Sequence, residues 1–137
     1  MGAWGNEPWQ TDGGADWFTS VFRGVSFKNS LHRAFQEDDN YDEIRAACFL
    51  LECLGRPGVW PDDLAELKTH LVLGIQRLTS MVKPEVGEDS TDFLELWGDD
   101  PEVKKAVKGQ IKQLKARLKD LDADALGAVR GKVFGNS

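Results

Sequence analysis

Apolar residues recur every three or four positions along most of the chain, which is the spacing of one helix face. The clearest stripe lies in residues 41–54 and comprises Ile44, Ala47, Cys48, Leu51 and Leu54. Phe49 and Leu50 widen this stripe, so we predict a helix that is buried on more than one side. Gly55 and Pro57 follow it and are typical of a helix end.

Two longer segments show the same periodicity. Residues 60–82 carry apolar positions at Leu64, Leu67, Leu71, Ile75, Leu78 and Val82. Residues 99–125 carry a seam of coiled-coil-like spacing at Val107, Ile111, Leu114, Leu118, Leu121 and Ala125. Both segments begin with proline and acidic residues, which favour the first turn of a helix because of its free N–H groups and dipole.

The remaining segments are shorter. We expect a helix capped by Asp12, with apolar positions at Ala15, Phe18, Val21, Phe22 and Val25. Residues 26–37 and the segment after Ser90 or Thr91 have the same character, whereas residues 1–11 have no periodicity. The predicted fold is therefore all-α: a single domain, 1–137, that is a compact array of four to five helices. It has an irregular N-terminal arm at 1–11 and a frayed tail at about 127–137.

Charge is distributed unevenly along this array. Residues 1–100 contain 8 Lys/Arg and 19 Asp/Glu, a net charge of −11, whereas residues 101–137 contain 9 and 4, a net charge of +5. Together they give the overall charge of −6. An acidic body repels phosphates, so we expect no nucleic-acid partner, while a basic protein partner is permitted.

No apolar run approaches the ~20 residues of a membrane span. The first residues have neither the basic start nor the apolar stretch of a signal peptide, and Asn6 does not fit a myristoylation motif. We therefore expect no membrane association and a cytoplasmic location.

Few residues suggest chemistry. Cys48 and Cys53 are expected to be two small buried hydrophobic residues, and His32 and His70 ordinary surface or boundary residues. No cofactor, metal ligand or catalytic residue is predicted, because phosphate-loop, GxSxG, HExxH and EF-hand patterns are all missing from the sequence. Enzyme activity is left open, although nothing in the sequence favours it.

Acidic clusters beside tryptophans are the best candidates for a binding site. The simplest explanation is solvation and stabilisation of helix starts. The alternative is an anionic face that steers a basic protein into contact, with exposed Trp60 or Trp97 as the anchor. The candidate partner-binding residues are Asp38, Asp39, Asp42, Glu43, Trp60, Asp62, Asp63, Trp97, Asp99 and Asp100.

The beginning of the chain resembles a known family. The MGAWG block at residues 1–5, followed by Trp9, Asp12 and the sequence ADW at 15–17, is similar to the opening of a bacterial family called domain of unknown function 4259. The sequence FLELW at 93–97, ahead of a charged long helix, resembles the closing segment of that family.

Three features depart from the family pattern: Glu7 where glycine is common, Thr11 where asparagine is common, and the basic last helix. The family has no established activity. The resemblance therefore implies a small helical bacterial cytoplasmic protein and assigns no catalytic residues.

The interpretation we favour is a non-catalytic protein-binding module, specifically an immunity-type antidote that neutralises a basic toxin domain. One alternative is a small-ligand-binding protein or enzyme whose site lies near the N-terminal arm, with Glu7, Asp12 and Asp16 around the indoles. Another is a protein that self-associates through the 107–125 helix.

Overall fold

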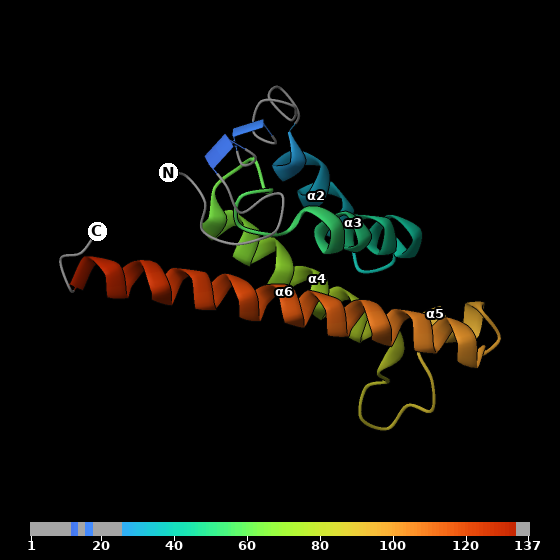
Figure 1. The fold of residues 1–137 in the computed structure, drawn as a ribbon. Coiled ribbons are helices and arrows are strands. Elements are labelled where there is room, and N and C mark those ends of the chain that lie inside the picture. Colours follow the sequence, from blue (N-terminus) through green and yellow to red (C-terminus); the bar gives the residue numbers. More distant parts are fainter. Residues whose placement is uncertain (1–11, 14–15, 18–25, 134–137) are drawn as a thin grey trace.

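The computed structural model describes residues 12–13, 16–17 and 26–133, with the side chains of the last helix described up to residue 123 (Figure 1). Within 26–133 the elements are all α-helices: α2 (Phe27–Phe35), α3 (Tyr41–Leu54), α4 (Leu64–Val82), α5 (Asp92–Leu96) and α6 (Pro101–Val133). This confirms the predicted all-α array. The N-terminal arm with its MGAWG block lies outside the described residues, as do Ala15, Phe18, Val21, Phe22 and Val25. Asp12 and Asp16 are exposed and helical.

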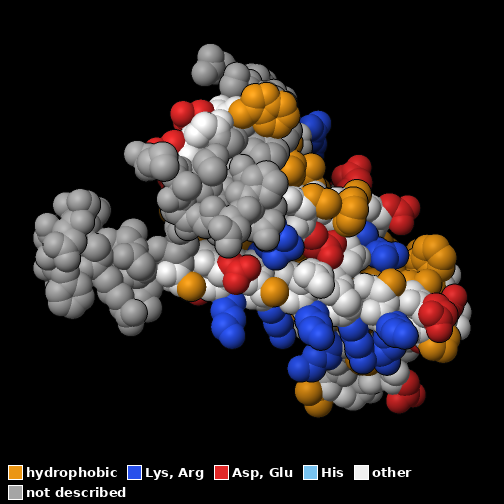
Figure 2. All heavy atoms as spheres, viewed as in Figure 1, with side chains coloured by type: hydrophobic (Ala, Val, Ile, Leu, Met, Phe, Trp, Pro, Cys, Tyr) orange, Lys and Arg blue, Asp and Glu red, His pale blue; other side chains and the backbone are white. Residues whose placement is uncertain are grey.

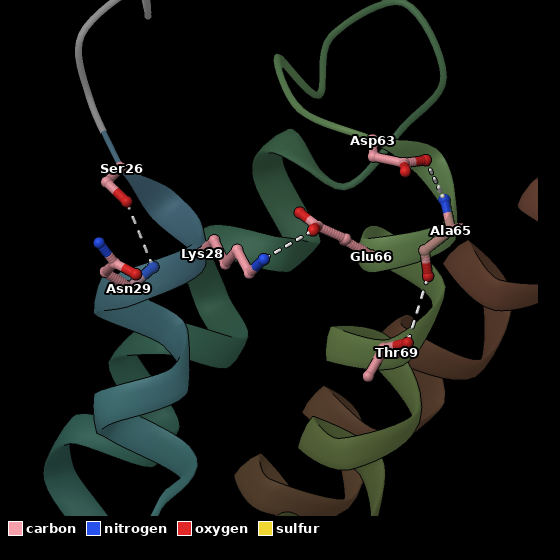
Figure 3. Close-up of polar contacts among 7 residues, drawn as sticks. All are labelled: Ser26, Lys28, Asn29, Asp63, Ala65, Glu66 and Thr69. Atoms are coloured by element: carbon pink, nitrogen blue, oxygen red, sulfur yellow. Dashed lines mark hydrogen bonds and ion pairs between the residues drawn. The ribbon is translucent and has the colours of Figure 1, made fainter.

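Side-chain caps fix where the helices begin. Ser26 accepts a hydrogen bond from the amide of Asn29, and Asp63 accepts one from the amide of Ala65 at 2.9 Å (Figure 3). Asp63 has an extended backbone, as a capping residue requires, so α4 begins at Leu64. Pro61 and Asp62 therefore precede the helix and do not form its first turn as predicted.

The cap of α6 uses the same chemistry. Asp100 accepts a hydrogen bond from the amide of Glu102 at 2.9 Å, and Pro101 is the first helical residue, where a missing N–H costs nothing. The helix continues to Val133, beyond Gly127, where the sequence analysis placed fraying.

The core forms where α6 lies along α4 and α3 (Figure 1). Val107, Leu114 and Leu121 of the seam are buried in the same cluster as Leu67, Leu71 and Leu78 of α4. These three seam positions are thus part of the chain's own core, whereas Ile111 and Leu118 are only partly buried against it. None of the helices in the described ranges is both long and apolar enough to cross a bilayer.

The helix α3 is less buried than its sequence predicts. Ile44, Cys48 and Leu51 face the core, whereas Phe49 is 61% exposed and Leu50 is only partly buried. The reason is that α2, α4 and α6 cover three sides of α3 and leave the side that carries Phe49 to solvent.

Candidate functional site

Acidic and apolar side chains meet at the end of the molecule where α5 lies (Figure 2). An open depression of about 590 Å³ there is lined by the segment 39–43 on one side and by Leu96 and Trp97 on the other. Leu96 is 72% exposed and Trp97 is 46% exposed. Large apolar side chains beside carboxylates provide both parts of a protein-binding surface, a desolvating anchor and a charged rim.

A second depression, of about 420 Å³, lies on the other side of Asp39 and Tyr41. It adds Glu85 and Glu88 from the α4–α5 loop, and Asp92 from α5, to the acidic face. These three carboxylates were not predicted as part of the site, because they lie more than 40 residues from Asp39 along the chain. Only the packing of α5 against the start of α3 brings the two groups together.

Tyr41 lies at the centre of this acidic face. Burial raises the pKa of its hydroxyl, and the nearby carboxylates of Asp92, Asp39 and Asp38 raise it further. The hydroxyl is therefore a neutral hydrogen-bond donor at physiological pH. The aromatic rings of Tyr41 and Phe93 are in edge contact, with their centroids 5.2 Å apart.

The ring of Phe93 positions both walls of the site. It is fully buried, and its centroid lies 6.4 Å from that of Trp97 as well as 5.2 Å from that of Tyr41. The short helix α5 is held by its cap: Thr91 accepts a hydrogen bond from the amide of Leu94 and donates one to the carbonyl of Met81. The exposed indole of Trp97 thus packs against the buried ring of Phe93.

Asp99 and Asp100 follow Trp97 directly and have structural tasks. Asp99 accepts a hydrogen bond from Ser90 Oγ at 2.7 Å, and its φ of 55° turns the chain from α5 into α6. Asp100 caps α6. Both still add negative charge beside the indole, although neither lines the depression.

Trp60 is a correction to the sequence analysis. It was expected to be an exposed anchor, but it is only 5% exposed and stacks on Phe27 with ring centroids 5.4 Å apart. A turn after α3, closed by a hydrogen bond from the amide of Trp60 to the carbonyl of Arg56, carries the indole into the core. Trp60 is therefore not available to a partner.

Two of the carboxylates near Trp60 are engaged in local contacts (Figure 3). Asp63 caps α4, and Glu66 forms an ion pair with Lys28 at 2.9 Å. Together, the two depressions described above are lined by Asp38 and Asp39 but not by Asp63 or Glu66. The candidate residues therefore fall into two groups. The group around Trp97 is the better candidate, because there an exposed indole and carboxylates line one depression.

The cysteine and histidine predictions were each half correct. Cys48 is buried, and burial raises the pKa of its thiol to about 12, whereas Cys53 is exposed. His32 is exposed, but His70 is buried because it lies on the inner side of α4, where its ring is in edge contact with Trp60. Among the described residues, no three His, Cys, Asp or Glu side chains are arranged to hold a metal ion.

Burial makes His70 sensitive to pH. Its Nε2 has no hydrogen-bond partner among the residues that the structure describes, and desolvation lowers the pKa of the imidazole. The carboxylates of Glu66 and Asp62 oppose this shift, and the cations Lys28 and His32 reinforce it. Protonation would place a charged N–H donor in the core without an acceptor, so it should favour the unfolded chain.

The free energy of unfolding should therefore have its full His70 contribution above the unfolded pKa of about 6.5. It should decrease as the pH falls from there toward the lower folded-state pKa. Urea denaturation at pH 7.5 and 5.5 would measure this decrease, with His70→Gln as the control that cannot titrate. Equal decreases in the wild type and in His70→Gln would contradict the assignment.

Comparison with known proteins adds no relative: no protein-family model, curated protein or solved structure matches this chain.

Proposed function

We propose that this chain is a non-catalytic protein-binding module whose depression between the α2–α3 loop and α5 receives a basic segment of a partner. The observation that carries the proposal is the exposure of Leu96 and Trp97 on the wall of a depression whose other wall is acidic. Tryptophan is enriched among the residues that dominate binding energy. The carboxylates around it would accelerate association with a cationic protein and select against anionic ones.

The specific form of this proposal is an immunity-type antidote that acts in the cytoplasm and neutralises a basic toxin domain. The net charge of −11 over residues 1–100 supports it. Membership in the bacterial family called domain of unknown function 4259 is also a proposal. It depends mainly on the N-terminal block, which lies outside the described residues.

Affinity capture of the tagged protein from the organism that produces it, washed at low and at high salt, would isolate the partner. The captured protein is then purified and its binding measured with variants. We expect Trp97→Ala to weaken the complex about tenfold to thirtyfold, because an indole anchor contributes roughly 1.4–2 kcal/mol to binding. The loss should appear mainly as faster dissociation.

Charge reversal tests the acidic wall separately. Asp38→Lys combined with Asp39→Lys should slow association at low salt and have less effect at high salt, because steering is screened. The matched control is Asp120→Lys with Asp122→Lys. It makes the same change in charge on α6, about 30 Å from the start of that helix at Pro101. If Trp97→Ala and the Asp38/Asp39 reversal both bind like the wild type, the site assignment is wrong.

A further inference from the structure

A groove between α3 and α6 carries an exposed aromatic ring. The groove encloses about 550 Å³, with Ala46 and Phe49 of α3 on one wall and Ala106 and Gly109 of α6 on the other. Phe49 is 61% exposed, although a phenylalanine can bury 150–250 Å² when it is covered. The small residues opposite keep the groove open on its α6 side.

Hydrogen bonds between α3 and α6 already engage the side chains of Arg45 and Gln110 in this groove. Arg45 Nε donates to Gln110 Oε1 at 2.9 Å, and Gln110 Nε2 donates to the carbonyl of Arg45 at 3.0 Å. Arg117 Nε donates to the carbonyl of Glu52 at 3.0 Å. Covering the groove would therefore leave these bonds intact, which lowers the cost of desolvation.

The same hydrogen bonds fix how the two helices align. Arg45 contacts Gln110 and Glu52 contacts Arg117, and both pairs are separated by 65 residues. The helices therefore run in the same direction and in register (Figure 1). Asp42 and Glu43 at the start of α3 consequently lie at about the same position along the helix axes as Lys105 and Lys108 on α6.

Exposed lysines form a ridge on α6 (Figure 2), defined by Lys105, Lys108, Lys112, Lys115 and Lys119. With about 100° per residue, the ridge lies on the side of α6 turned away from Gln110 and Arg117, hence away from α3. The outer face of the two helices thus has acidic residues at one edge, the groove in the middle and lysines at the other edge.

We propose that this face is the interface of a homodimer in which the Phe49 rings of the two chains meet in the groove, beside the two-fold axis. A two-fold axis that runs along the groove, parallel to both helices, leaves the position of each residue along the helix axes unchanged. It places the α3 edge of one chain against the α6 edge of the other. Lys105 and Lys108 of one chain then face Asp42 and Glu43 of the other. A second copy is the occupant that this face fits, because a two-fold interface needs one patch that complements itself in shape and charge.

Asp42 and Glu43 also border the depression beside Trp97, so dimerisation and binding of a basic partner would compete for them. The test therefore uses the purified full-length chain alone. Sedimentation equilibrium at low salt should show a concentration-dependent dimer. Phe49→Glu should weaken it about tenfold or more, since it places a charge at the centre of the interface.

The control for Phe49→Glu is Val86→Glu, which makes the same kind of change at a fully exposed position of the α4–α5 loop and should leave the dimer unchanged.

Asp42→Lys with Glu43→Lys should weaken the dimer at low salt, as should Lys105→Glu with Lys108→Glu. All four changes in one chain should restore it, whereas they should not restore binding of a basic partner. Circular dichroism would verify that each variant is folded. A wild-type chain that stays monomeric at its highest soluble concentration, or a fourfold variant that fails to recover, would overturn the dimer without affecting the proposed partner site.

Discussion

Replacing Phe93 with alanine is expected to lower the free energy of unfolding by about 3–5 kcal/mol, the usual cost of removing a buried aromatic ring. Phe93 is fully buried and contacts the rings of both Tyr41 and Trp97. Its removal leaves a cavity under α5, which has only five residues and cannot hold its position by helix propensity. Urea denaturation would measure the loss.

Leu96→Ala is the matched control for Phe93→Ala. Leu96 lies on the same short helix but is largely exposed, so its truncation should change the free energy of unfolding by less than about 0.5 kcal/mol. Phe93→Ala should also weaken partner binding under conditions where it remains folded, because Trp97 loses its support. A small stability loss for Phe93→Ala, similar to that of Leu96→Ala, would mean that α5 is not held as described.

Replacing Gly74 with leucine is the second large effect, a loss of about 3 kcal/mol from overpacking. A Cβ at position 74 would lie 3.1 Å from Cys48 Sγ, 3.1 Å from Leu114 Cδ1 and 3.4 Å from Phe35 Cζ. These atoms belong to α3, α6 and α2, so these three helices all approach α4 at Gly74. A leucine side chain has no space to enter without separating them.

Gly74→Ala separates this steric effect from helix propensity. Alanine gains about 1 kcal/mol over glycine inside a helix, which should offset much of the strain of a single methyl group at 3.1 Å. Its net change should therefore be within about 1 kcal/mol. Thermal or urea unfolding of both variants would give the difference, and a Gly74→Leu protein as stable as Gly74→Ala would show that the core can open at this point.

The local structure of this protein follows from its sequence. The bounds of α3, a cap at Ser90 or Thr91 and the start of α6 after Asp100 follow from residues within one or two helical turns of each other. Helix periodicity and capping depend on such short separations, so they can be read without the fold. The acidic segment at 37–43 was visible for the same reason.

Which face of each helix is covered depends on the packing of the helices and could not be predicted from the sequence. Trp60 and His70 are buried and Phe49 is exposed, in each case against expectation, because burial depends on neighbours that are distant in sequence. Packing of α5 on α3 likewise joined Trp97 to Asp39 and added Asp92 to the acidic face. A residue's type indicates its preference for the interior, but the number of interior positions is set by how the helices meet.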